Sequence, residues 1–201
     1  MSLLDIFFPR QCFNCQSEGK YLCDKCSLFL VDLPDIKMEG FEQVTCCWEY
    51  NGIAKKIISE AKTRGMFDAL RELTDKALSE RETLLPDDLL ITFVPMEEKE
   101  ERLKGFNHAE VIAKQLGRIT DRKVISLLEQ KLENKQEGLG KEERFTNARR
   151  KFAVKKDIKL PQNILLVDDF ITSGATMIEC SKALRCRGAK KVWGFTLAKV
   201  N

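Results

Sequence analysis

The sequence lacks long hydrophobic runs, has little net charge and contains one histidine in 201 residues. No apolar stretch approaches the roughly 18 residues that a membrane-spanning helix needs, and this excludes a membrane span. The first residues, MSLLDIFFPR, form too short a segment and carry Asp5 too early for a secretory signal, so a cytoplasmic location is expected. The net charge of +3 excludes a polycation. Any contact with nucleic acid would therefore come from local basic patches.

The sequence also lacks a nucleoside-triphosphate-binding loop of the G-x-x-x-x-G-K-[ST] type. Gly140-Lys141 is followed by glutamate and has no glycine five positions earlier. Internal repeats and low-complexity tracts are absent. Hydrophobic residues make up 43% and charged residues 32% of the chain, as is typical of a globular protein. A chain of this length can form one mid-sized domain with a small additional module.

Four of the eight cysteines form a regular pattern. Two residues separate Cys12 from Cys15 and Cys23 from Cys26, and seven residues lie between the two pairs. This spacing suits one tetrahedral Zn²⁺ with four thiolate ligands. Because all four positions would be protein ligands, the expected site is structural. Two disulfides or unrelated buried thiols are the alternatives, and a reducing compartment disfavours the disulfides.

The zinc-binding module is expected to span residues 1–34, where Pro34 interrupts the pattern. A segment of this size cannot bury enough apolar surface alone, so metal binding would supply its folding energy. The second domain would then span residues 35–201. The remaining cysteines have no ligand spacing and are expected to be small buried residues: Cys46, Cys47, Cys180 and Cys186.

The second domain alternates strand and helix patterns. Strands are predicted at 44–50, 89–95, 163–168 and 192–200, with a short one at 124–128, and helices at 53–64, 67–78, 108–117 and 175–187. Residues 96–107 are predicted to form a charged loop. Residues 129–159 have no sustained period and are predicted to form a solvated loop, basic over 141–159. Strands that alternate with helices indicate an α/β fold with a largely parallel sheet.

The segment NILLVDDFITSGATM places two acids at the end of an apolar strand, before a turn of small and hydroxylated residues. Ligands of open α/β sheets bind beyond the carboxyl ends of the strands, where Asp168 and Asp169 would lie. Backbone amides of the turn at 172–176 and the helix N-terminus behind it favour a phosphate. The two carboxylates can accept hydrogen bonds from ribose hydroxyls or organise Mg²⁺. The pattern therefore predicts a ribose 5-phosphate site.

The acid pair also fits two alternative structures. A receiver domain begins with a strand that ends in adjacent acids, but the 32 residues after Asp169 are too few for its remaining elements. A capped helix after a strand with solvated acids is the simpler alternative, although capping alone does not require adjacent acids.

VDDFITSGAT resembles the phosphoribosyl-pyrophosphate (PRPP) signature of type I phosphoribosyltransferases. The whole chain resembles the ComF family of competence-associated proteins, which includes the GntX-like proteins. Four features match in order: the four-cysteine module, the segment FVPMEEKEERLKGFNHAE, the stretch with Gln136, Leu139, Arg144, Asn147 and Phe152, and the PRPP signature. The chain departs from the family at His108, where glutamine is common, and at Lys104, where arginine is common.

The resemblance implies a type I phosphoribosyltransferase-like fold that binds PRPP with Mg²⁺. Asp168 and Asp169 would hold the ribose hydroxyls and, indirectly, the metal. The 5-phosphate would lie against Thr172, Ser173, Gly174, Ala175 and Thr176. The pyrophosphate would meet Pro95, Met96, Arg102 and Lys104. Arg144, from a lid at 131–150, is the expected catalytic cation beside the two aspartates, and His108 is expected to cap a helix or lie beside the ligand.

Three functions remain open. The first is a phosphoribosyltransferase, for which no sequence feature identifies the acceptor. The second, implied by the resemblance, is a factor in natural transformation that handles internalised single-stranded DNA, alone or with other competence proteins. Its phosphate contacts would come from 141–159 and from a basic cluster of Lys182, Arg185, Arg187, Lys190 and Lys191. The third is a regulator that binds PRPP without turnover.

Overall fold

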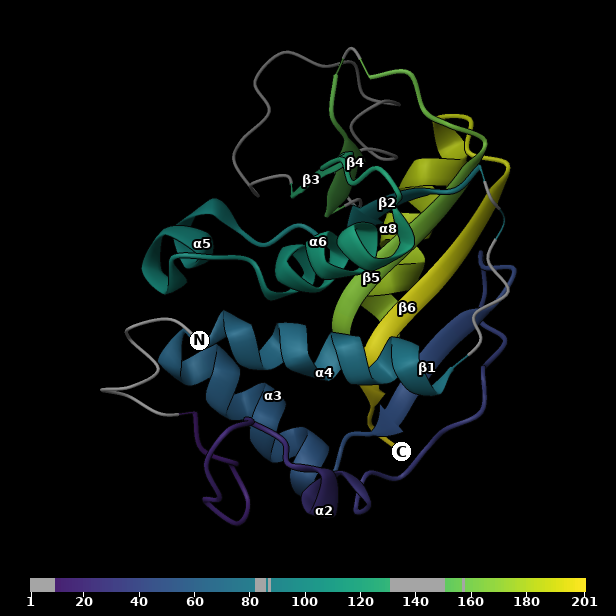
Figure 1. Cartoon of the computed structure of the whole chain (residues 1–201). Coiled ribbons are helices and arrows are strands. Elements are labelled where there is room, and N and C mark those ends of the chain that lie inside the picture. Colours follow the sequence, from purple (N-terminus) through teal and green to yellow (C-terminus); the bar gives the residue numbers. More distant parts are fainter. Residues whose placement is uncertain (1–9, 82–85, 87, 131–150, 157) are drawn as a thin grey trace.

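The computed structural model describes residues 10–81, 86, 88–130, 151–156 and 158–201 (Figure 1). Its centre is a four-stranded sheet in the order β1-β6-β5-β2. The strands are β1 (Val44–Glu49), β2 (Leu90–Phe93), β5 (Asn163–Ile171) and β6 (Lys191–Lys199). All three neighbouring pairs run parallel. The predicted α/β fold with a parallel sheet is confirmed.

Helices cover both faces of the sheet (Figure 1). One face packs against α3 (Gly52–Arg64), α4 (Phe67–Glu80) and α6 (His108–Thr120). The other face packs against α8 (Ala175–Cys186) and a two-stranded antiparallel ribbon of β3 (Leu128–Gln130) and β4 (Phe152–Val154). The alternation along β5 explains both layers, because Leu165 and Val167 belong to the first core cluster while Ile164 and Leu166 belong to the second.

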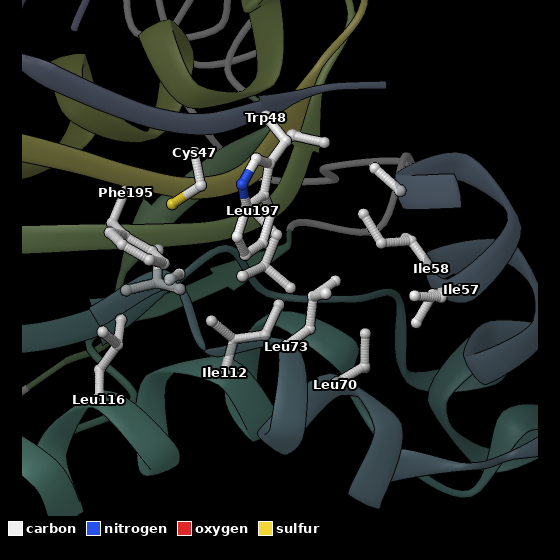
Figure 2. Close-up of a cluster of buried hydrophobic side chains, with 14 of the residues drawn as sticks. Cys47, Trp48, Ile57, Ile58, Leu70, Leu73, Ile112, Leu116, Phe195 and Leu197 are labelled. Atoms are coloured by element: carbon white, nitrogen blue, oxygen red, sulfur yellow. The ribbon is translucent and has the colours of Figure 1, made fainter. Parts of the chain in front are cut away.

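The first core cluster is the larger one and joins three helices to the sheet. Figure 2 shows Leu70 and Leu73 of α4 with Ile112 of α6 below Phe195 and Leu197 of β6. All five side chains are at most 2% exposed. Burial of an aliphatic or aromatic side chain of this size stabilises a protein by about 1.5–3 kcal/mol. This packing therefore fixes where the helices end relative to the carboxyl edge of the sheet.

The N-terminal module packs on α4. The carboxylate of Glu72 accepts hydrogen bonds from the backbone amides of Tyr21 (3.2 Å) and Leu22 (2.8 Å). Cys12, Leu22 and Cys26 are buried in the same cluster as the helices. A short helix, α2 (Asp24–Ser27), completes this region. The module thus shares its hydrophobic core with the larger part of the chain.

Several local predictions need correction. Residues 98–104 form helix α5 (Glu98–Lys104) rather than a loop, and Gly105 ends it at a φ of 81°. The region expected to lack structure contains β4. The short strand expected at 124–128 is reduced to one parallel bridge between Val124 and Ile91, and β3 follows it.

The remaining cysteines divide into two groups. Cys46, Cys47 and Cys180 are fully buried, as expected, but Cys186 is exposed. The prediction of a buried side chain is wrong for Cys186, because this residue lies on the outer face of α8 with the exposed Glu179 and Lys182, while Leu184 in the same turn is buried. Within the described parts of the chain, no helix has the length and apolar character to cross a membrane.

Candidate functional site

The acid pair lies inside β5 at the carboxyl edge of the sheet. β5 continues to Ile171, beyond the predicted end at residue 168, and pairs with β6 through Ile171. Its pairing with β2 stops at Val167, which accepts a hydrogen bond from the amide of Val94 (2.9 Å). Asp168 and Asp169 therefore follow directly where the neighbouring strand ends, as the sequence predicted.

The two carboxylates have different surroundings. Asp168 Oδ1 accepts a hydrogen bond from the Asp169 amide (2.9 Å), and Asp169 Oδ1 accepts one from the Phe170 amide (2.7 Å). Asp169 Oδ2 lies 2.6 Å from Nζ of Lys62, which α3 brings to the site. Burial and the charge of Asp169 raise the pKa of Asp168 to about 8. Without a ligand, the pair therefore holds a proton on Asp168 and an ion pair on Asp169 at neutral pH.

Aromatic rings surround the ion pair. The Lys62 ammonium lies 4.1 Å from the centre of the Phe170 ring, a cation–π contact. Tyr50, directly after β1, stacks on Phe170 with ring centres 4.2 Å apart and ring planes 7° apart. These contacts join the ends of β1, β5 and α3. They also fix the side chain of Lys62 in one position above the acid pair.

His108 is the most buried polar group beside the acids, with 2% of its side chain exposed. Its Nδ1 lies 3.8 Å from Asp169 Oδ2, and its Nε2 is buried without a hydrogen-bond partner among the described residues. Burial lowers the pKa of His108 to about 4, so the imidazole is neutral at pH 7. The helix cap expected from His108 is instead provided by Asn107, whose side chain accepts from the Ala109 amide (2.9 Å).

The turn after β5 leads directly into α8. Thr172, Ser173, Ala175 and Thr176 are exposed, while Gly174 is buried at a φ of 78°. A Cβ atom at Gly174 would lie 2.7 Å from Sδ of Met38, so only glycine fits without displacement of that side chain. Backbone amides at the N-terminus of a twelve-residue helix favour a negatively charged group.

A cavity of about 190 Å³ lies next to the acid pair. Of the residues predicted from the sequence, its lining includes Pro95, Met96, Asp168, Asp169 and Thr176. The structure adds Val94, Glu97, Glu100, Asn107, His108, Ala109, Gln130, Lys151 and Phe152. The β2 end, the start of α6, the β3–β4 ribbon and the start of α8 thus converge on one space. A larger cavity of about 460 Å³ lies between Arg10, α4 and α6, and neither Asp168 nor Asp169 lines it.

The other predicted residues do not line this cavity or lie outside the described residues. Arg102 and Lys104 belong to α5, which lies beyond the N-terminal end of α6 in Figure 1 and does not contribute them to the lining. Thr172, Ser173, Gly174 and Ala175 form the adjoining turn and are not in the lining either. Arg144 lies outside the described residues, as do Gln136, Leu139 and Asn147.

Sequence patterns did not identify Lys62, Tyr50, Gln130 or Lys151 as site residues. Lys62 occupies a polar position of an amphipathic helix, and such positions are usually solvated. Only the approach of α3 to β5 shows its role, so no local signal was present. Among the residues that the structure adds to the lining, His108 had been considered from the sequence, because it is the one histidine of the chain and directly follows Gly-Phe-Asn.

The four N-terminal cysteines come together as predicted. Their Sγ atoms all lie within 4.8 Å of one another, a separation compatible with Zn–S bonds of about 2.3 Å in a tetrahedral site. The Ser17 hydroxyl, 3.2 Å from the Cys15 thiol, lowers the pKa of Cys15 to about 6. A thiolate is the form that binds a metal ion. The chemistry and the geometry of these donors fit one structural zinc ion.

Of the two basic segments considered for DNA, the first is only partly described. Most of 141–159 lies outside the described residues, which include Lys151, Lys155, Lys156 and Lys159. In the second cluster, Arg185 donates to the Gly40 carbonyl (2.9 Å) and pairs with Glu42 (3.1 Å), and Lys182 pairs with Glu39 (2.9 Å). Arg187, Lys190 and Lys191 are exposed. The second cluster is therefore less basic than its sequence suggests.

Comparison with known proteins finds similarity over nearly the whole chain. The "Competence protein ComFC" of Streptococcus pneumoniae is 28% identical over 189 residues, which cover 94% of this chain and 80% of that protein. The protein of the same name in Bacillus subtilis is 25% identical over 207 residues (94% and 83%). The "Competence protein F" of Haemophilus influenzae is 27% identical over 204 residues (95% and 86%). No family model matches the sequence.

Proposed function

Since the chain belongs to the ComF family of competence-associated proteins, we propose that it binds PRPP with Mg²⁺ at the carboxyl edge of its sheet. The observation that carries this proposal is the convergence of Pro95, Met96, Asp168, Asp169 and Thr176 on one cavity. These residues come from separate segments of the chain, and the family resemblance implies a PRPP contact for each of them. The phosphate turn adjoins the cavity at Thr176.

Different residues of the chain would contact the ribose, the 5-phosphate and the pyrophosphate of PRPP. The hydroxyls of the ribose would donate to Asp168 and Asp169. The amides of residues 172–176 would hold the 5-phosphate, with the positive end of α8 behind them. The pyrophosphate would lie toward Pro95 and Met96, with Lys151 across the cavity. Arg144, from the predicted lid, would close over it.

The lining favours a ligand that brings a metal ion. Glu97, Glu100, Asp168 and Asp169 all line the cavity, against one lysine, Lys151. Carboxylate oxygens are the donors that Mg²⁺ prefers, so the residues present fit this ion. Bound Mg²⁺ would neutralise phosphate charge and stabilise the charge that develops on departing pyrophosphate.

We further propose that the four-cysteine cluster holds one structural zinc ion and that the protein acts in DNA uptake during natural transformation. The second proposal is supported by the names of the three relatives, each of them a competence protein. Exposed lysines at the β3–β4 ribbon and Arg187, Lys190 and Lys191 at the end of α8 could contact a single-stranded DNA backbone.

Calorimetry with PRPP, with and without Mg²⁺, tests ligand binding. Release of pyrophosphate in the presence of nucleobases or single-stranded DNA then distinguishes a transferase from a regulator. Binding with release supports a transferase, and binding without release supports a PRPP sensor. Arg144→Ala should weaken binding or turnover more than Arg149→Ala, because only Arg144 belongs to the family-like Arg-x-x-Asn element. The absence of binding in both conditions would contradict the proposal.

A further inference from the structure

Lys62 forms an ion pair with Asp169, one of the two carboxylates that the proposed ligand would contact. Its Nζ lies 2.6 Å from Asp169 Oδ2, and the two side chains are 24% and 13% exposed. The other oxygen of Asp169 accepts a hydrogen bond from the Phe170 amide (2.7 Å). Both oxygens of Asp169 are therefore engaged within the protein. A partly buried pair of this kind is screened by salt less than a surface pair.

The position of Lys62 is well determined by its neighbours. Ile58 and Ala61 anchor α3 in the core, and Gly65 ends the helix at a φ of 65°. The Phe170 ring lies 4.1 Å below the ammonium and is covered on its other side by Tyr50. The ammonium therefore cannot leave Asp169 without giving up a contact with Phe170 as well. Displacement requires a ligand that offers Asp169 a better partner.

We propose that Lys62 is a tethered cation that keeps free divalent ions out of the unliganded acid pair. Asp168 and Asp169, with Glu97 nearby, would otherwise be a set of oxygen donors open to a hard cation, whereas Glu100 is already paired with Lys104. With its ammonium on Asp169, Lys62 supplies the neutralising charge from within the chain. Mg²⁺ would then enter with a phosphorylated ligand, whose other contacts compensate for the loss of the Lys62–Asp169 pair.

This inference rests on the proposed function, because it takes the acid pair as the ligand site. It makes Lys62 a positioning residue that acts through Asp169 and sets the order of binding. A purely structural role predicts that removal of the ammonium would lower stability and leave metal affinity unchanged or weaker. If the Lys62 ammonium competes with a divalent ion for Asp169, its removal should raise metal affinity. The sign of the change in metal affinity therefore distinguishes the two roles.

The test uses Mn²⁺ alone as the probe, followed by electron paramagnetic resonance without PRPP. Lys62→Met, which keeps the apolar stem over Phe170, should bind Mn²⁺ about tenfold more tightly than the wild type, or about 1.4 kcal/mol. Lys62→Arg retains the positive charge and should behave as the wild type. Lys56→Met, at an exposed position of the same helix, is the matched control and should have no effect. Addition of Asp169→Asn to Lys62→Met should remove the gain.

Lys62→Gln provides the same test if the methionine variant does not fold, because an amide can donate to Asp169 without a positive charge. Wild-type Mn²⁺ affinity in both uncharged variants would overturn the inference. Titration of the wild type with PRPP and Mg²⁺ is a separate measurement. No PRPP binding there, together with tighter Mn²⁺ binding by Lys62→Met, would remove the proposed ligand and leave the role of Lys62 intact.

Discussion

Asn107 joins the beginning of α6 to the end of β2 through Val94. Its side-chain amide donates to the Val94 carbonyl (3.0 Å), while its side-chain oxygen caps the helix at Ala109. One buried side chain, 3% exposed, thus sets the distance between the segment of Pro95 and the position of His108. Both border the cavity beside the acid pair.

Replacement of Asn107 by alanine should therefore damage stability and the site together. We expect a loss of about 2–3 kcal/mol in the free energy of unfolding, from the cap and from the unpaired Val94 carbonyl, and weaker PRPP binding. Asn51→Ala is the matched control, because Asn51 precedes α3 without a side-chain cap hydrogen bond. Urea unfolding and calorimetry measure both effects. Equal losses in the two variants would contradict the role assigned to Asn107.

The raised pKa of Asp168 predicts a pH-dependent stability in the absence of ligand. Its pKa is about 8 in the folded protein, above the ordinary value of 3.8. Between these values the folded state keeps a proton that the unfolded state has lost, so this group destabilises the fold increasingly as pH rises from about 4 to 8. Asp168→Asn cannot ionise and should therefore have a higher Tm than the wild type at pH 7.5.

The difference should vanish near pH 4, where Asp168 is protonated in the folded state and largely so in the unfolded state. Thermal unfolding of both proteins across this range, without added Mg²⁺ or PRPP, provides the measurement. A difference in Tm that stays constant with pH would show that folding does not raise the pKa of Asp168.

Gly174→Ala tests the phosphate turn. The new Cβ would both strain a backbone at a φ of 78° and contact Met38, so we expect a loss of about 1–2 kcal/mol in stability and weaker PRPP binding. Gly188→Ala is the control for strain alone, because Gly188 has a φ of 107° and no atom within 4 Å of the added Cβ. Met38→Ala combined with Gly174→Ala should restore part of the lost affinity. If the double variant regains no PRPP affinity, backbone strain at residue 174 alone accounts for the loss.

The cysteine cluster should carry about one zinc ion per chain. Cys12→Ser should lose the metal and destabilise residues 10–34, which share a core with α4. Cys186→Ser, an exposed cysteine outside the cluster, should retain it. Elemental analysis of protein purified anaerobically without chelators measures both. Zinc-free wild-type protein prepared in this way would contradict the proposed site.

The strand and helix order and the acid pair with its turn were accessible from the sequence because their signals are local. Apolar runs marked the strands, and the acids and the turn of residues 172–176 lie within one short segment. Helix α5 could not be predicted because none of its described side chains is buried, and Leu103 is 80% exposed. The pairing of β3 with β4 joins three-residue strands on either side of a long segment, and nothing in their composition reveals it.

Contacts between distant segments account for the site features that the sequence does not reveal. The Lys62–Asp169 pair joins α3 to β5, and no spacing rule connects residues so far apart in the chain. The neutral state of His108 likewise depends on burial by several elements. The exposure of Cys186 follows from its place on the outer face of α8, four residues after the exposed Lys182. Periodicity predicts which face is buried, and the tertiary structure decides which side chains meet.

The most direct test of the central claim is calorimetric titration with PRPP in the presence of Mg²⁺. Asp168→Asn combined with Asp169→Asn retains the shape of both side chains and removes their charge. Asp121→Asn, at the exposed far end of α6, is the control. We predict that the wild type and the control bind PRPP equally and that the double variant, folded by circular dichroism, binds at least about tenfold more weakly, or 1.4 kcal/mol. Equal affinity in the wild type and the double variant would contradict the assignment of the acid pair as the ribose site.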